Sequence, residues 1–106
     1  LLALAIGLAD SRGAQQVVIG CHSGDAAVYP DCRRGFVEAF HRVARLATEE
    51  RVSVAAPLVT RSKAEVVAFG RELGAPLELT YSCYRGNPEP CETCGACRAR
   101  AEALAS

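Results

Sequence analysis

Four cysteines near the C-terminus are the strongest chemical signal in the sequence. Cys83, Cys91, Cys94 and Cys97 follow the spacing C-x7-C-x2-C-x2-C, and the glycines and prolines among them permit the tight turns that such a cluster needs. Four thiolates at this spacing are typical of one tetrahedral Zn²⁺ ion. Because sulfur would fill all four positions around the ion, the sequence predicts a structural zinc site with one ion per chain.

Two other uses of these cysteines are open. A pair of disulfides is disfavoured, because nothing in the sequence marks the chain as secreted and cytoplasmic thiols stay reduced. An iron–sulfur cluster is the closer rival, since ferredoxin-type sequences also separate cysteines by two residues. Their fourth cysteine lies in a downstream segment and is followed by proline, and Cys83 does not match that pattern. We therefore expect zinc, in a cytoplasmic protein.

The remaining cysteines and the two histidines carry weaker signals. Cys21 and Cys32 are interpreted as small loop residues, because one neighbouring arginine is weak evidence for a reactive thiol. His41 lies in a charged helical stretch and is expected to be solvated. His22 follows a predicted strand, where a side chain can meet a ligand.

The hydrophobic pattern predicts helices and strands in alternation. A capping box, in which Ser62 and Glu65 satisfy each other's backbone donors, places the start of one helix at Lys63, and Gly74 marks its end. Gly13 marks the end of the first helix in the same way. The first predicted helix contains the apolar run 1–8 and ends just before Gly13. The other predicted helices cover residues 35–50, 63–73 and 97–105, and the predicted strands cover residues 15–20 and 52–55.

This order of elements favours parallel strands joined by right-handed crossovers, as in a doubly wound α/β sheet. Ligands bind such sheets beyond the carboxyl ends of the strands, where residues 21–34 and 56–62 form loops. We divide the chain into residues 1–80, which form the sheet part, and residues 81–106, which form a four-cysteine loop and a terminal helix.

Composition limits the classes of partner. The 106 residues are 50% hydrophobic and 23% charged, which is typical of a folded domain. Twelve basic and twelve acidic residues give a net charge of 12 − 12 = 0, which disfavours a protein that coats nucleic acid. The apolar run at residues 1–9 is about half of the ~20 residues that a membrane span needs, and it lacks the basic start of a signal peptide. Because the sequence contains no methionine, we expect the C-terminal portion of a longer protein.

Four segments together resemble a known family. They are Gly-Cys-His-Ser-Gly-Asp at residues 20–25, Tyr-Pro-Asp-Cys-Arg at 29–33, Ser-Lys-Ala-Glu at 62–65, and Ser-Cys-Tyr at 82–84 with the three later cysteines. In order and separation these segments resemble the 7-cyano-7-deazaguanine synthases of the QueC family over nearly the whole chain. The second segment and the four-cysteine loop are the more specific parts of the resemblance.

The resemblance implies a fold, an activity and a set of ligands. The fold would be part of a PP-loop ATP pyrophosphatase domain, similar to the adenine nucleotide alpha hydrolases, with a zinc-binding loop at its C-terminus. The activity would be an ATP-dependent ligase that converts 7-carboxy-7-deazaguanine and ammonia to 7-cyano-7-deazaguanine in queuosine biosynthesis. ATP and Mg²⁺ would serve as co-substrates and Zn²⁺ as a structural ion. No direct nucleic-acid or membrane partner is implied, and a homodimer is left open.

The resemblance also suggests roles for single residues. Lys63 is the best candidate to neutralise phosphate charge, because a cation in the first turn of a helix opposes the helix dipole unless an anion lies between them. Asp25 and Asp31 would hold a magnesium-bound phosphate or the amidine edge of the purine-like base. Arg33 would pair with the substrate carboxylate, and Tyr29 would stack on the heterocycle. The catalytic candidates are Lys63, Asp31 and Arg33. The alternative is that the loop residues bond their own backbone and that the lysine only covers apolar surface.

Two departures from the family pattern limit these assignments. The family commonly has asparagine where His22 stands, so the contact made there would differ. The family's phosphate-binding loop, Ser-Gly-Gly-x-Asp-Ser, is not found in the 106 residues, and no Walker-type loop replaces it. Because ATP binding needs such backbone donors, we expect the chain to be inactive alone. Two alternatives are a zinc-stabilised binding module without catalysis and a PP-loop ligase or transfer RNA thiolation enzyme with another substrate.

Overall fold

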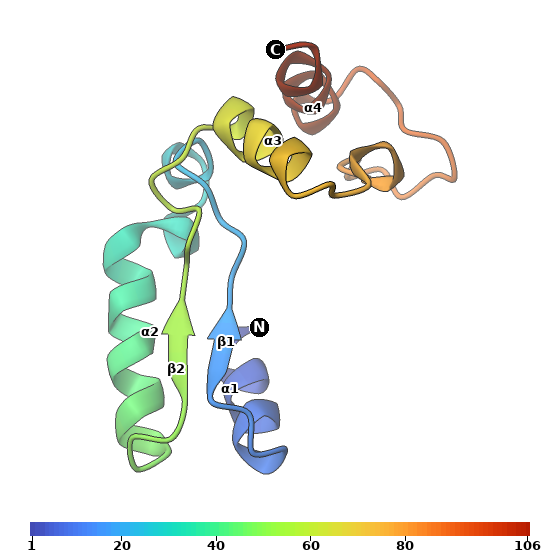
Figure 1. Ribbon diagram of the computed structural model, residues 1–106. Helices are drawn as coiled ribbons and strands as arrows, with labels where there is room; N and C mark the ends of the chain where they lie inside the picture. The colour runs from blue at the N-terminus through green and yellow to red at the C-terminus, as the bar shows by residue number, and fades with distance from the viewer. The chain divides into compact units, whose positions relative to one another are not determined.

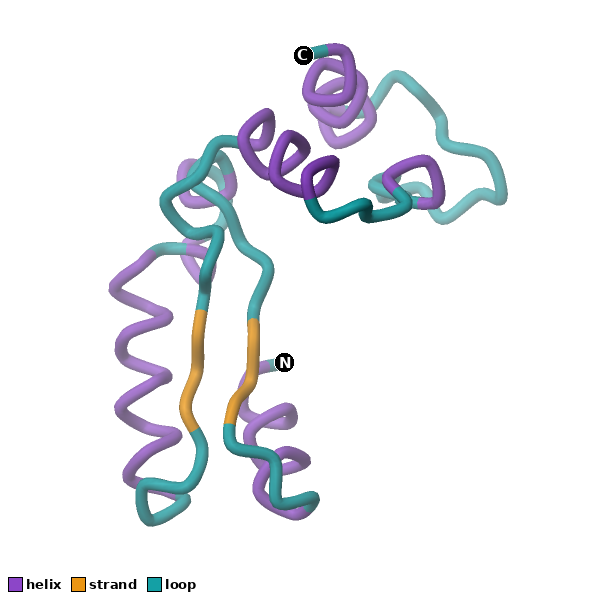
Figure 2. Tube along the Cα trace, in the orientation of Figure 1, coloured by secondary structure: helices purple, strands orange, loops and turns teal.

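The computed structural model describes all residues from Leu1 to Ser106 and divides them into two compact units, Leu1–Thr60 and Arg61–Ser106. The first unit, blue to green in Figure 1, contains α1 (Leu2–Ser11), β1 (Gln16–Val18), α2 (Arg34–Ala47) and β2 (Ser53–Ala55). The second unit, yellow to red, contains α3 (Lys63–Glu72) and α4 (Gly95–Ala105). Short 3₁₀ turns lie in the connections (Figure 2), at Asp25–Ala27, Pro30–Cys32 and Leu77–Leu79.

The two strands pair in parallel, as the order of elements predicts. Val17 lies opposite Val54, and the pairing continues for one residue on either side. Because parallel strands end at the same edge of a sheet, the loops that follow β1 and β2 both leave from that edge. An α/β arrangement with a parallel sheet is therefore confirmed. The additional strands and the second helical layer of a doubly wound sheet stay a prediction.

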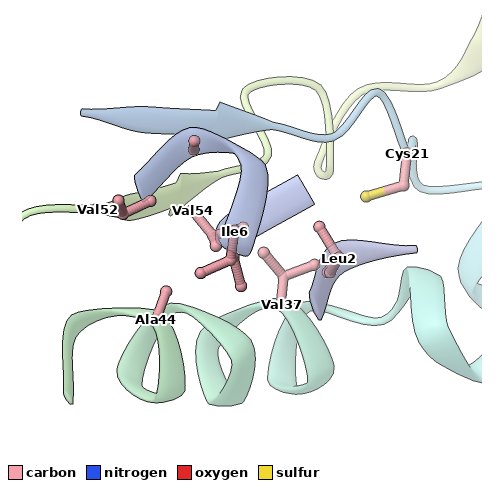
Figure 3. Packing of buried hydrophobic residues seen from close by; sticks show 8 residues of the cluster. Leu2, Ile6, Cys21, Val37, Ala44, Val52 and Val54 are labelled. Atoms are coloured by element: carbon pink, nitrogen blue, oxygen red, sulfur yellow. The ribbon is translucent and has the colours of Figure 1, made fainter. Parts of the chain in front are cut away.

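Both helices of the first unit pack on the sheet face that carries Val54. Ile6 of α1 and Val37 of α2 point toward this valine (Figure 3), and burial of each such side chain contributes about 1.5–3 kcal/mol. Cys21, which lies in the loop after β1, is also buried in this cluster. The core therefore fixes the start of the loop that carries most of the candidate site residues. The buried members of the cluster are Leu2, Ile6, Ala9, Cys21, Val37, Ala44, Val52 and Val54.

Helix α1 is buried on one side only, although apolar residues recur on every face of it. Leu2 and Ile6 face the core, whereas the side chains of Leu1, Leu4 and Leu8 are 106%, 79% and 58% exposed. Apolar residues at nearly every position carry no period, so the sequence pattern could not distinguish the two sides. The predicted end of the helix is confirmed, because Gly13 adopts a φ of 67°.

The turn between α2 and β2 is organised by Thr48, the one buried polar side chain of the protein. Its hydroxyl donates to the carbonyl oxygen of Ala44 at 2.7 Å and accepts the N–H of Val52 at 3.0 Å. Val52 is fully buried, so water cannot replace that acceptor. The hydroxyl therefore links the last turn of the helix to the start of the strand.

We expect Thr48→Val to lower the free energy of unfolding of the first unit by about 1–3 kcal/mol, because the variant keeps the shape of the side chain but leaves the buried Val52 N–H without an acceptor. Thr48→Ser keeps the hydroxyl and should lose less than about 1 kcal/mol, the contribution of one methyl group. Urea denaturation of both variants measures the difference. Equal midpoints for the two variants would show that the hydroxyl contributes nothing.

The second unit begins with the predicted capping box. Ser62 accepts the N–H of Glu65 at 3.2 Å, and the Glu65 carboxylate accepts the N–H of Ser62 at 2.6 Å. The backbone N–H of Ser62 is the largest cause of a lowered pKa of the Glu65 carboxyl, and the Ser62 side chain lowers it further. Gly74 closes the helix with a φ of 67°, as predicted. Both ends of α3 therefore follow from local sequence signals.

Helix α3 packs against α4 within the second unit. Arg71 of α3 donates to the carbonyl oxygens of Leu104 and Ser106 at 2.6 and 2.7 Å, where the last turn of α4 lacks backbone donors. Residues 61–80 are consequently part of the same compact unit as the cysteine segment. The division at residue 80, which separates a nucleotide-binding part from a metal-binding loop by function, stays a prediction.

Candidate functional site

The four predicted metal ligands converge in the second unit. The sulfur atoms of Cys83, Cys91, Cys94 and Cys97 all lie within 4.8 Å of one another, and those of Cys91 and Cys97 are 4.0 Å apart. A tetrahedral ion with bonds of about 2.3 Å would separate its sulfur ligands by about 3.8 Å. Four soft sulfur donors at nearly that spacing fit a tetrahedral ion, so the cluster could hold a metal ion.

Helix α4 starts inside this cluster, two residues earlier than predicted. The sulfur of Cys94 accepts the N–H of Cys97 at 3.4 Å, which makes Cys94 the N-cap of the helix. The pattern of apolar residues does not reveal a cap supplied by sulfur, and for that reason the predicted start at residue 97 is wrong. Cys97 therefore lies in the first turn of α4, and the helix backbone fixes the direction of its side chain.

Hydrogen bonds distribute charge unevenly among the four sulfurs. The Thr93 hydroxyl, followed by the backbone N–H groups of Cys94 and Thr93, lowers the pKa of the Cys91 thiol to about 5. The N–H of Cys91 donates to the sulfur of Cys83 at 3.4 Å and is the largest cause of the lowered pKa of Cys83. Burial raises the pKa of Cys97 to about 12. Hydrogen bonds therefore favour the charged form of Cys91 and Cys83, whereas burial disfavours the charged form of Cys97.

The link between Cys91 and Cys94 is strained at Glu92. Glu92 has a φ of 57°, and the N–H of Thr93 donates to the carbonyl oxygen of Cys91 at 2.7 Å across it. A three-residue turn with positive φ at its centre is rare and costs about 1 kcal/mol or more for a residue with a Cβ. The ligand loop therefore holds a conformation that glycine would adopt without strain.

We expect Glu92→Gly to raise the affinity of the cluster for Zn²⁺ several-fold, because it removes about 1 kcal/mol of backbone strain from the ligand loop. The matched control is Glu89→Gly, since Glu89 is exposed in the same loop and is not among the residues with positive φ. That control should bind Zn²⁺ no more tightly than the unaltered chain, because glycine at an ordinary φ only adds freedom to the unfolded state. Competition with a chromophoric chelator measures both affinities. A weaker affinity for Glu92→Gly would contradict the strain.

The first unit has a separate group of candidate residues, in the loop after β1. The Asp25 carboxylate accepts the N–H of His22 at 3.0 Å and lies 3.4 Å from the His22 Nε2. The His22 Nδ1 accepts the N–H of Gly24 at 3.1 Å. With one ring nitrogen as acceptor and the other beside a carboxylate, His22 is held in one orientation. His22 and Asp25 therefore stabilise the conformation of this loop through bonds to its own backbone.

Other candidates in the loop are placed differently. The Arg33 Nε donates to the carbonyl oxygen of Ala26 at 3.2 Å, which ties the end of the loop to its middle. The side chains of Tyr29, Asp31 and Arg33 are all exposed at the surface. The structure thus brings His22 and Asp25 together and leaves the three others with exposed side chains.

The two cysteines outside the cluster are poor nucleophiles. Burial is the largest cause that raises the pKa of both the Cys21 and the Cys32 thiol, and the charges of Asp25 and Asp31 raise the pKa of each further. A thiol that keeps its proton at neutral pH reacts slowly. The interpretation of these two residues as unreactive loop cysteines agrees with their surroundings.

His41 is half-buried rather than solvated, which corrects the prediction. Its Nδ1 lies 3.0 Å from the carbonyl oxygen and 3.2 Å from the backbone nitrogen of Val54. These groups of Val54 point away from β1, because Ser53 and Ala55 make the bonds to β1. His41 therefore covers the outer edge of β2 and has a structural role.

Lys63 lies in the second unit, at the first position of α3 behind the Ser62 cap. Its side chain is half-buried. Glu65, the acidic residue of that first turn, uses its carboxylate on the backbone of Ser62, and the ion pairs of the protein do not include Lys63. A cation thus lies at the positive end of a helix without a carboxylate partner.

None of the helices combines the length and the apolar composition that a membrane crossing requires.

Comparison with known proteins supports a single family. The family model for the queuosine biosynthesis protein QueC matches residues 1–106. A 7-cyano-7-deazaguanine synthase of Methanoculleus marisnigri is 46% identical, in an alignment 106 positions long that covers 98% of this chain and 48% of the relative. Synthases of the same name from Pseudoalteromonas atlantica and Archaeoglobus fulgidus are 42% and 45% identical, and the matches cover 98% of this chain and 48% and 44% of those relatives. The chain spans about half the length of the curated relatives it matches.

Proposed function

The chain belongs to the QueC family, and on this basis we propose that it acts as part of a 7-cyano-7-deazaguanine synthase, an ATP-dependent ligase of queuosine biosynthesis. The observation that carries the proposal is a family match over residues 1–106 in a chain whose four C-terminal cysteine sulfurs gather within 4.8 Å. The substrates would be 7-carboxy-7-deazaguanine, ammonia and ATP. The cytoplasm, where thiols stay reduced, is the expected location.

The proposed reaction removes both oxygens of a carboxylate. ATP activates the carboxylate, ammonia displaces the activated oxygen, and the product is an amide. A second ATP activates the amide oxygen, which then leaves as the nitrile forms. Both activations develop charge on phosphate oxygens, and fixed cations or N–H donors aimed at that charge stabilise the transition state. Mg²⁺ would accompany the ATP phosphates.

Within this reaction we assign Lys63 to the phosphates, because it is a cation at a helix start that the protein itself does not neutralise. Asp31 and Arg33 present exposed polar groups from the loop at the carboxyl end of β1 and would contact substrate or the magnesium-bound phosphate. His22 and Asp25 would position that loop through their hydrogen bonds. Tyr29 would stack on the heterocycle.

The cysteine cluster would hold one Zn²⁺ ion with a structural role. Four thiolates leave no open coordination position for substrate, so the ion would order the loop and the start of α4 rather than take part in the chemistry. The donor set agrees with this role, because the sulfurs already lie near tetrahedral spacing and accept hydrogen bonds from the loop backbone. Mass spectrometry under native conditions would measure the metal content.

The test of the ligase is a chimera. The chain is joined to the part of the Methanoculleus marisnigri synthase that it does not match, and the complete relative serves as the positive control. We expect the purified chimera to form the nitrile from 7-carboxy-7-deazaguanine, ammonia and ATP, detected by mass spectrometry, and the 106-residue chain alone to form none. A folded, metal-loaded chimera without nitrile formation would contradict the proposal and favour a binding module. Turnover by the chain alone would contradict its dependence on a separate phosphate-binding loop.

A further inference from the structure

We propose that Thr93 is a positioning residue for Cys91 in the metal cluster. Thr93 lies between the second and third cysteine ligands and contacts Cys91 twice. Its N–H donates to the carbonyl oxygen of Cys91 at 2.7 Å, and its hydroxyl donates to the sulfur of Cys91 at 3.6 Å. The inference rests on the metal site proposed above, and it adds a side chain that is not itself a ligand.

The two contacts act on different parts of Cys91. The backbone bond closes the tight turn around Glu92 and so fixes where the cysteine Cα lies. The hydroxyl bond selects the rotamer that directs the sulfur toward the other ligands, 4.0 Å from the sulfur of Cys97. Together they hold the ligand before an ion arrives, which lowers the ordering cost of binding.

The hydroxyl also compensates charge. Four thiolates around one divalent ion carry excess negative charge, and hydrogen bonds to the sulfurs reduce their mutual repulsion. Backbone N–H groups donate to the sulfurs of Cys83 and Cys94, and ordinary side-chain substitutions leave those donors in place. The Tyr81 hydroxyl donates to the carbonyl oxygen of Asn87 at 2.7 Å, and it is also one of the hydrogen-bonding groups that lower the pKa of Cys83. Thr93 therefore provides a side-chain donor to a ligand sulfur that mutation can remove.

We expect Thr93→Val, which keeps the shape and loses the hydroxyl, to bind Zn²⁺ about tenfold more weakly than the unaltered 106-residue chain, the lower end of the usual effect of second-layer partners. Thr93→Ser should restore the affinity to within about threefold, because it restores the donor. Titration with Zn²⁺ against a competing chelator gives the affinities. Titration with Co²⁺ gives a second readout, since the sulfur-to-cobalt absorption should change for Thr93→Val and return for Thr93→Ser. Thr60→Val, at an exposed threonine of the other unit, is the matched control and should change neither readout.

Two outcomes would overturn the proposal alone: an unchanged Zn²⁺ affinity for Thr93→Val, or equal losses for the valine and serine variants, which would indicate a packing effect rather than a hydrogen bond. Failure of the unaltered chain to bind Zn²⁺ would overturn both this proposal and the proposed metal site. Failure of the chimera to form nitrile, with Zn²⁺ binding intact, would overturn only the ligase. The three failures are therefore distinguishable.

Discussion

Cys97→Ser is expected to weaken Zn²⁺ binding by the chain more than a hundredfold and to melt the second unit at ordinary temperature. Structural zinc contributes an apparent 10–16 kcal/mol or so to small domains, and one quarter of that, for one of four ligands, is about 3 kcal/mol, or a factor above 100. The second unit has little else to hold it. Its buried apolar side chains are those of Val67, Cys83, Cys97 and Ala103, so half of them belong to the proposed metal site.

The measurement is the far-ultraviolet circular dichroism of the chain during heating, with Zn²⁺ and with an excess of chelator. The unaltered chain with chelator should lose the signal of α3 and α4 in a separate, earlier transition, and Cys97→Ser should behave the same way even with Zn²⁺ present. Cys32→Ser is the control, because Cys32 is a half-buried cysteine outside the cluster. It should bind one Zn²⁺ with unchanged affinity. Identical melting of the unaltered chain with and without chelator would contradict a structural ion.

The parts of the fold that the sequence predicts well are those with local causes. The capping box at Ser62 and Glu65 needs only residues three apart, and the left-handed positions at Gly13 and Gly74 need only the absence of a Cβ. The gathering of the cysteines is predictable for a similar reason, since the spacing limits how far apart the sulfurs can lie. Short-range signals therefore predict both ends of α3 and the gathering of the four cysteines.

The features that sequence patterns do not predict depend on contacts with residues far along the chain or on the backbone conformation. His41 is half-buried because Val54, thirteen residues later, presents the free edge of a strand to its ring. Helix α4 starts earlier than predicted because a cysteine sulfur caps it in place of the usual serine or aspartate oxygen. The contact between Thr93 and Cys91 exists only because Glu92 adopts a positive φ. No pattern of hydrophobicity contains this information.

The loop after β1 shows a limit of a different kind. Residue types there predicted polar contacts correctly, but the same groups serve either a ligand or their own backbone. The structure places Asp25 on the N–H of His22, and Arg33 on the carbonyl oxygen of Ala26. These bonds define the loop shape, whereas the side chain of Asp31 is exposed. Residue types alone could not predict which of these groups bond within the loop.

Lys63→Gln in the chimera is expected to lower kcat/KM for ATP by a factor of about 10²–10³, the usual effect of removing one fixed group that stabilises transition-state charge. The same substitution should stabilise the folded protein by about 0.3–1 kcal/mol, because it removes a cation from the positive end of α3. The two effects have opposite signs. A lysine that only covered apolar surface would produce no loss of activity, and its replacement by glutamine would also cost some packing.

The matched control is Arg61→Gln, which removes a cation two residues earlier. The Arg61 guanidinium lies over the Phe69 ring, 4.6 Å from its centroid, so its loss should cost about 0.5–1 kcal/mol of stability and leave kcat/KM for ATP within about threefold. Steady-state kinetics at varied ATP and urea denaturation of both variants provide the two readouts. If Lys63→Gln kept full activity, or if both variants lost activity in proportion to stability, then Lys63 would not act on the phosphates. A gain in stability together with a large loss of activity is the result expected for a phosphate-binding lysine, because the phosphate that neutralises its charge belongs to the substrate and not to the protein.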